Sequence, residues 1–283
     1  MVQAKQELRS RIRSVSSTRK ITSAMEMIAN AKLLKQRKMM ENNREYARVL
    51  KSTVDEIAAK NKDIESEFMA AKKSTGTLTL IFCSDLGLCG SYNANIMKYA
   101  KENLKTEDPI LVIGTALRRS LSEAGFRILN EPVQTDTITF LELKDYVRQG
   151  VHMYMQDQVS VFQILYMQFI NTMTFSPKTE TLLPCVMEGG SAEKEEGPQA
   201  ETLFEPDPQT ILSDLIPMML DSVSYAAWLE TKTAEQGNRR VAMKTATDNA
   251  DDLNESLRLE YNKARQASIT QEITEIIGGS SAV

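Results

Sequence analysis

The two ends of this chain lack the residues that stop helices. Residues 1–75 contain neither glycine nor proline, and no proline follows Pro217. Between Pro217 and Gly278 the only glycine is Gly237. Proline removes a backbone donor and glycine loses conformational entropy on folding, so their scarcity favours long helices at both ends. A chain that begins and ends in a long helix, with a different segment between, is suited to placing two helices side by side.

Aromatic residues and long apolar runs are also scarce. Aromatic residues make up 6% of the chain, which suits a helical rod better than a compact enzyme core. No run approaches the roughly 18 apolar residues that a membrane-spanning helix needs. The basic N-terminus is not followed by an apolar leader, and Glu7 and Glu26 argue against a mitochondrial presequence. We therefore expect neither a membrane span nor a leader.

Residues that bind metals or form disulfides are few. The chain has three cysteines, no Cys-x-x-Cys motif and one histidine, His152. This set excludes a zinc cluster and favours a reduced, cytoplasmic compartment. We predict no metal, no cofactor and no catalytic residue.

Charge is distributed unevenly along the chain. Residues 1–51 carry 13 Lys and Arg against 4 Asp and Glu, a net +9, and with −4 overall the remainder carries −13. A basic helix on an acidic protein implies an acidic partner surface, which could be nucleic acid, anionic lipid or protein; the alternative is a solvated helix face. The basic run over 32–38 lacks the interleaved aromatic residues that stack on bases, which weakens the nucleic-acid interpretation.

Apolar residues at helical spacing predict a shaft helix over 1–60 and a second one over 207–283. The N-terminal stripe comprises Leu8, Ile12, Val15, Ile21, Met25, Ile28, Tyr46, Leu50, Val54 and Ile57. The C-terminal stripe comprises Leu212, Ile216, Met219, Val223, Ala226, Ala250, Leu253, Leu257, Tyr261 and Ala264. Heptad spacing implies a partner helix, so we predict a long antiparallel coiled coil of the two ends, with a helical bundle as the alternative. Pro217 should kink the second helix or start a new one.

The middle of the chain, 77–187, alternates predicted strands with predicted helices. The predicted strands are 77–83, 109–114, 127–133, 159–170 and 180–187, and the predicted helices are 91–104, 115–124 and 139–156. This alternation predicts a mainly parallel, Rossmann-like α/β domain. The acidic, glycine-rich segment 188–206 is predicted to be a mobile loop.

The loop Ser84–Gly90 lies between a strand and a helix, where phosphate-binding loops lie. It lacks both the Gly-Lys-Ser/Thr ending and the G-x-G-x-x-G spacing, so a tight turn is the favoured interpretation. Cys89 has no neighbouring base in the sequence, which favours a structural role. Near the C-terminus, Ile269, Ile273, Ile276 and Ile277 form a stripe that suits a narrow apolar collar, whereas a frayed end fits only 278–283.

Five ordered motifs carry a resemblance to a known family. Thr18–Leu33 resembles the N-terminal signature of the F-type ATP synthase gamma subunits, and Asp85–Gly90 resembles their central glycine loop. Phe204–Pro208 resembles the entry to their last helix, and Val241–Ala250 and Tyr261–Gln271 resemble their C-terminal signature. The match begins near the N-terminus and 188–206 has no cysteine pair, so the resemblance is to the bacterial type.

The resemblance implies a non-catalytic central rotor shaft that couples proton or sodium flow to ATP synthesis. It implies three alpha and three beta subunits, an epsilon subunit and a membrane c-ring as partners, at the cytoplasmic face of the plasma membrane. The positions that match family contacts with the alpha/beta head are Met25, Arg265, Gln266, Ile269, Ile273 and Ile276. The chain departs from the family pattern at Leu86, Pro217 and Arg240.

Two other functions remain open from the residues alone. A nucleotide-dependent α/β enzyme with helical arms would bind nucleotide as an isolated chain, although no phosphate loop or acid–base pair supports it. A basic coiled-coil adaptor would bind DNA or lipid in a strongly salt-dependent way.

Overall fold

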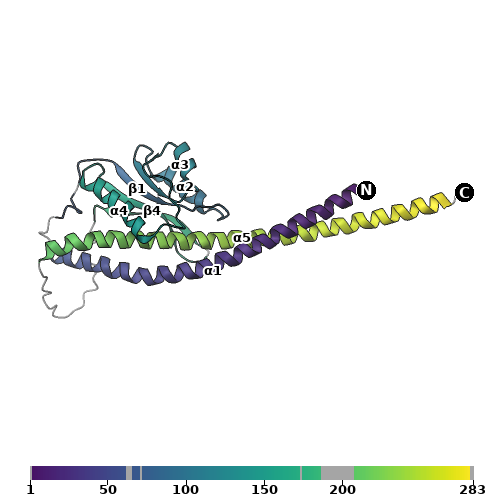
Figure 1. Cartoon of the computed structure of the whole chain (residues 1–283), viewed down its shortest axis with the longest axis horizontal. Helices are drawn as coiled ribbons and strands as arrows, with labels where there is room; N and C mark the ends of the chain where they lie inside the picture. The colour runs from purple at the N-terminus through teal and green to yellow at the C-terminus, as the bar shows by residue number, and fades with distance from the viewer. Residues whose placement is uncertain (1, 62–65, 71, 173, 186–206, 281–283) are drawn as a thin grey trace. The chain divides into compact units, whose positions relative to one another are not determined.

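The computed structural model describes residues 2–61, 66–70, 72–172, 174–185 and 207–280, and the predicted mobile loop 188–206 lies outside them. The chain forms two compact units. The helix-pair unit comprises residues 1–31 and 239–283, and the α/β unit comprises residues 32–238. Two long helices, α1 (Val2–Lys60) and α5 (Pro208–Ser280), each contribute to both units (Figure 1).

The α/β unit contains a five-stranded sheet in the order β3-β2-β1-β4-β5 (Figure 1). Its strands are β1 (Thr77–Phe82), β2 (Pro109–Ile113), β3 (Arg127–Ile128), β4 (Val161–Phe169) and β5 (Phe175–Leu183). The first four strands run parallel, and β5 is antiparallel to β4. The shorter helices are α2 (Tyr92–Asn103), α3 (Arg118–Glu123) and α4 (Phe140–Met155). The predicted mainly parallel α/β domain is therefore confirmed.

Strand β3 is shorter than the predicted segment 127–133. The side chain of Asn130 accepts a hydrogen bond from the Val112 N–H at 2.9 Å and donates one to the Val112 carbonyl at 2.9 Å. These bonds satisfy the backbone of β2 where a longer β3 would otherwise pair with it. Because an amide side chain carries both a donor and an acceptor, it can replace a strand residue at this edge. Strand β5 also begins five residues before the predicted 180–187.

The two faces of the sheet are covered by different helices. Leu78, Leu80 and Phe82 of β1 belong to a buried cluster that also contains residues of α4, α1 and α5. The alternate residue Ile81 belongs to a second cluster with residues of α2 and α3. Side chains of a strand point alternately to its two faces, so each face of this sheet has its own apolar core. The apolar segments 50–57 of α1 and 212–220 of α5 are buried in the first cluster, as their spacing predicts.

Helix α5 is continuous through Pro217, so the prediction that a new helix begins there is wrong. The residues around the proline, Ile216, Met219 and Leu220, are buried in the α/β unit. Burial of this apolar face stabilises the helix more than one lost backbone hydrogen bond destabilises it. Gly237 sits where a Cβ would lie 2.6 Å from the Phe175 ring, so the glycine permits close contact between α5 and β5.

In the helix-pair unit, α1 and α5 run antiparallel, which confirms the predicted orientation. Ser16 donates to Asn254 at 3.2 Å, Arg19 pairs with Asp251 at 2.9 Å, and Thr247 donates to Thr22 at 2.8 Å. As the residue number rises on α1, it falls on α5. Three contacts at successive turns of the helices fix a single register for the pair.

The buried face of this unit differs from the predicted apolar stripe. Ile21 and Ile28 are each 58% exposed and Leu253 is 49% exposed, so these three were assigned to the wrong face. The face that is buried on α5 comprises Met243, Thr247, Ala250, Asn254, Leu257 and Ser268. Small and polar residues occupy core positions here because the hydrogen bonds to α1 satisfy them. Ile21 and Ile28 of α1 are thereby left on the surface.

Within the described residues, no helix combines the length and the apolar character that crossing a membrane requires. This includes the long segments of α1 and α5, whose heptads are interrupted by charged side chains.

Candidate functional site

Five of the six predicted head-contact residues are exposed on α5. Arg265 and Gln266 are exposed on α5, and Met25 is partly buried on α1. Ile269, Ile273 and Ile276 are 46%, 51% and 72% exposed. Their spacing of four and three residues places the isoleucines on one helix face. The structure therefore presents an unburied apolar stripe where the sequence predicts one, and whether it contacts a partner stays a prediction.

The register of the helix pair shows why this stripe is unburied. Ser16 lies opposite Asn254 and Thr22 lies opposite Thr247. The same register places Val2, the first residue of α1, near Ser268, which is buried. The isoleucines follow Ser268 and extend beyond the start of α1, so α5 forms the tip of this unit alone. Exposed apolar residues that share one helix face are a candidate surface for binding another protein.

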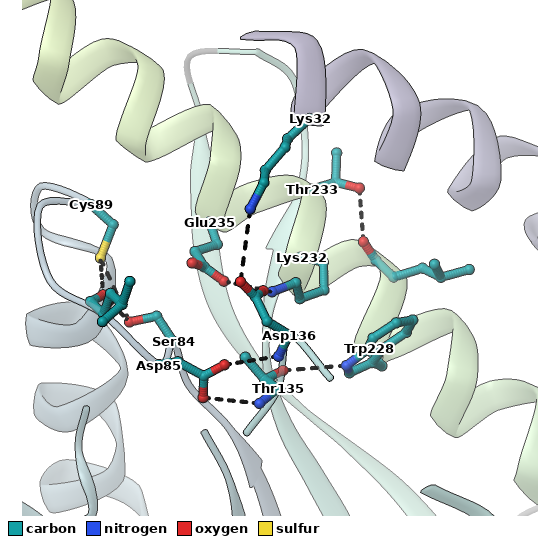
Figure 2. Close-up of polar contacts among 12 residues, drawn as sticks. Lys32, Ser84, Asp85, Cys89, Thr135, Asp136, Trp228, Lys232, Thr233 and Glu235 are labelled. Atoms are coloured by element: carbon teal, nitrogen blue, oxygen red, sulfur yellow. Dashed lines mark hydrogen bonds and ion pairs between the residues drawn. The ribbon is translucent and has the colours of Figure 1, made fainter. Parts of the chain in front are cut away.

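A second site, which the sequence did not reveal, lies in the α/β unit. It is a cluster of charged side chains from α1, the β1–α2 loop, the segment before α4, and α5 (Figure 2). We call it the polar junction and define it by Lys32, Asp85, Asp136, Lys232 and Glu235.

The β1–α2 loop contributes a carboxylate that holds the segment before α4. Asp85 Oδ1 accepts a hydrogen bond from the Thr135 N–H at 2.9 Å, and Asp85 Oδ2 accepts one from the Asp136 N–H at 2.8 Å (Figure 2). On the other side, the Trp228 indole N–H of α5 donates to Thr135 Oγ1 at 3.3 Å. The buried residue Thr135 is thereby fixed between the sheet and α5.

Helix α5 contributes a buried cation to the polar junction. The Lys232 side chain is 3% exposed, and its ammonium contacts Asp136 Oδ1 and lies 3.3 Å from Glu235 Oε2. Lys32 of α1 lies 3.8 Å from the other oxygen of Asp136. The Asp136 carboxylate therefore links one lysine from each long helix. Burial lowers the pKa of Lys232, and the charge and hydrogen bond of Glu235 partly offset this effect.

Neighbouring residues of α5 complete the hydrogen bonds of the sheet. Strand β4 pairs with β1 only as far as Leu165. Beyond that point, Thr231 Oγ1 accepts from the Met167 N–H at 3.0 Å, and Glu230 accepts from the Phe169 N–H at 3.4 Å. Since buried backbone groups must be paired, α5 side chains replace the missing strand. Glu230 also pairs with Arg44 of α1 at 3.0 Å.

The geometry of the loop Ser84–Gly90 favours the tight-turn interpretation. Ser84 Oγ donates to the Leu86 carbonyl at 2.7 Å and accepts from Asn93 Nδ2 at 2.7 Å. Cys89 Sγ lies 3.6 Å from Asn93 Nδ2 and 3.8 Å from Ser84 Oγ, and Cys89 is buried. The loop also carries the negative charge of Asp85, which disfavours a phosphate. Its polar groups form hydrogen bonds within the turn and to the backbone of residues 135 and 136.

The polar junction had a weak signal in the sequence. Lys232 lies among small and hydroxyl-bearing residues over 231–234, and Glu235 follows it by one helical turn. A lysine in such a stretch can indicate a buried ion pair. Its partner Asp136 is 96 residues away in the sequence, so no local pattern identifies it.

Known proteins resemble this chain in sequence over almost its whole length. The ATP synthase family model matches residues 4–283. The ATP synthase gamma chain of Alkaliphilus metalliredigens is 36% identical over 283 residues, and that of Heliobacterium modesticaldum is 34% identical over 284 residues. Each of these alignments covers 98% of both chains.

Two solved structures share the fold. A chain from the central stalk and c-ring structure of the Tetrahymena thermophila mitochondrial ATP synthase matches with a TM-score of 0.56 and 23% identity, covering 80% of this chain and 99% of that one. A chain from the Euglena gracilis mitochondrial ATP synthase matches with a TM-score of 0.56 and 19% identity, covering 92% and 95%. The full-length similarity in sequence, with the shared fold, shows that the chain belongs to the ATP synthase gamma chain family.

Proposed function

We propose that this chain is the central rotor shaft of an F-type ATP synthase. It couples ion flow through a membrane c-ring to ATP synthesis in a head of three alpha and three beta subunits. In this role the chain is non-catalytic, and it also binds an epsilon subunit. It acts as a peripheral protein at the cytoplasmic face of a bacterial plasma membrane. Membership of the gamma chain family supports this assignment.

The observation that carries the proposal is the unburied isoleucine stripe on α5. Ile269, Ile273 and Ile276 lie beyond the start of α1 and are 46–72% exposed. An apolar tip can turn within an apolar collar without one deep energy minimum, because dispersion contacts depend little on direction. Arg265 and Gln266, just before the stripe, provide directional contacts that can define resting angles of the shaft.

The first experiment tests assembly. The chain is co-expressed with the alpha and beta subunits of the same organism, and the purified complex is analysed by native mass spectrometry. One copy of this chain with three copies of each partner is expected. Nucleotide binding by the isolated chain would support the enzyme alternative, and salt-dependent binding to DNA or vesicles without assembly would support the adaptor alternative.

The second experiment tests the tip contact by charge reversal. Arg265→Glu should reduce ATP synthesis in the membrane-bound complex while leaving assembly intact. Loss of one member of a buried ion pair costs about 3–5 kcal/mol, so a contact between Arg265 and an acidic residue of a beta subunit would be strongly weakened. Arg119→Glu is the matched control, because Arg119 is exposed on α3 and pairs only with Glu123 of the same helix at 2.7 Å among its described contacts. Parental synthesis by the Arg265→Glu complex would show that the assigned contact is wrong.

A further inference from the structure

We propose that Asp136 and Lys232 are positioning residues that fix the sheet of the α/β unit to both long helices, so that this unit transmits torque as one body. The inference rests on the proposed rotor function. It assigns the joint that transmits torque to the polar junction of the α/β unit, whereas the predicted head-contact residues belong to the helix-pair unit.

The segment around Asp136 is held from three directions. Asp85 holds its backbone from the end of β1 through two hydrogen bonds of 2.9 and 2.8 Å. Trp228 of α5 holds the Thr135 side chain. The Asp136 carboxylate then contacts Lys232 of α5 directly and Lys32 of α1 at 3.8 Å (Figure 2). A displacement of either helix relative to the sheet must break or stretch at least one of these contacts.

Apolar packing in the same unit does not provide this restraint by itself. The large apolar clusters bury both long helices against the sheet, but apolar contact energy is non-directional. Small sliding motions between packed helices are a common form of domain movement. The attraction within an ion pair falls as its two groups separate, so a pair that joins two elements resists sliding. The polar junction supplies such a pair at the point where α5 passes the ends of the strands.

The burial of Lys232 in the polar junction indicates a role other than general stability. An apolar residue of similar volume at a buried ion pair is often as stable as the pair or more stable. Lys232 is 3% exposed and has lost most of its hydration, while its partner Asp136 is 43% exposed. The contact between them joins α5 to the segment before α4, and for a shaft the relevant arrangement is the angle between the sheet and the helices.

The test uses the complete membrane-bound complex, in which ATP hydrolysis and ATP-driven ion pumping are measured together in vesicles. Asp136→Asn and Lys232→Met are expected to lower the number of ions pumped per ATP several-fold while ATP hydrolysis continues. A residue that served only folding would lower assembly and both rates together.

A matched control comes from the same helix. Lys244 pairs with Asp248 at 2.8 Å, but both groups are exposed and the pair lies within α5. Lys244→Met should therefore retain parental coupling. If Lys232→Met does not assemble, Asp136→Asn keeps the test valid, because Asp136 is partly exposed and the amide retains its shape. Hydrogen exchange over residues 134–138 of the assembled Asp136→Asn complex should increase at the same time.

The outcomes separate the two proposals. If the parental complex hydrolyses ATP without pumping ions, the proposed rotor function itself is wrong. If the parental complex pumps and Asp136→Asn pumps the same number of ions per ATP, the rotor function stands and the torque joint is overturned. A loss of coupling in Lys244→Met equal to that in Lys232→Met would also overturn it, because the effect would then not be specific to the junction.

Discussion

At the scale of single residues, close approach between elements limits which side chains the fold accepts. Gly150 of α4 lies against the ring of Phe162 in β4, which is fully buried. A Cβ at position 150 would lie 2.4 Å from that ring. Since Phe162 is surrounded by the apolar core, the ring cannot move aside without disturbing its neighbours.

Gly150→Ala is therefore expected to destabilise the chain by about 1–3 kcal/mol, as other overpacked cores are. This loss should exceed the gain of about 1 kcal/mol that alanine brings over glycine within a helix. Gly87→Ala is the control, because a Cβ at position 87 meets no atom within 4 Å. Thermal unfolding followed by circular dichroism measures both. An unchanged or raised midpoint in Gly150→Ala would contradict the close contact with Phe162.

At the scale of elements, helix α4 begins with a capping box that depends on pH. Thr139 N–H donates to Glu142 Oε2 at 2.7 Å, and the Glu142 N–H donates to Thr139 Oγ1 at 3.3 Å. The hydrogen bonds from the Thr139 backbone and side chain lower the pKa of Glu142. The stabilisation is present above the ordinary value of 4.5 and is lost as the pH falls through the lowered folded value.

We expect the protection of the first turn of α4 against hydrogen exchange to fall when the pH drops well below 4.5. Glu142→Gln should show a protection that varies less with pH, because the amide does not titrate in this range. Thr139→Ala should lower the protection at every pH, since loss of such a cap costs about 1 kcal/mol. Equal pH profiles for the parental and Glu142→Gln chains would rule out Glu142 as the titrating group.

The C-terminal part of α5 carries the exposed isoleucines and can be shortened in two steps. Deleting residues 278–283 removes none of the three exposed isoleucines, whereas deleting residues 269–283 removes all of them. Each isoleucine that is buried in a partner contributes about 1.5–3 kcal/mol. We expect the shorter deletion to retain ATP-driven pumping in the assembled complex. The longer deletion should lower pumping while the complex still assembles. Equal losses from both deletions would show that the isoleucine stripe is not the bearing surface.

At the scale of the whole molecule, the chain carries no arrangement that predicts nucleotide chemistry in its described parts. The loop Ser84–Gly90, which lies between a strand and a helix, uses its polar groups in its own turn and presents the Asp85 carboxylate to the polar junction. We expect the purified chain neither to bind nor to hydrolyse ATP. Titration calorimetry with Mg-ATP tests this, and the complex with alpha and beta subunits is the positive control. Micromolar binding by the chain alone would contradict it.

The sequence by itself determined the elements and their order. Absence of glycine and proline at both ends predicted the two long helices, and alternating strand and helix patterns predicted the mainly parallel sheet. These signals are local, because backbone propensity and side-chain period act over a few residues. The motifs in Thr18–Leu33 and Tyr261–Gln271 likewise indicated the family before any contact was known.

Only the tertiary structure decided which side chains meet. Thr22 rather than Ile21 faces α5, and Asn254 rather than Leu253 faces α1, because hydrogen bonds between the helices satisfy the polar pair positions. An apolar stripe does not by itself predict its partner, because apolar residues also occur on exposed helix surface. The contact between Lys232 and Asp136 spans 96 residues and depends on where the sheet places the end of β1. Such pairings depend on how distant segments pack together, and a short stretch of sequence does not contain that information.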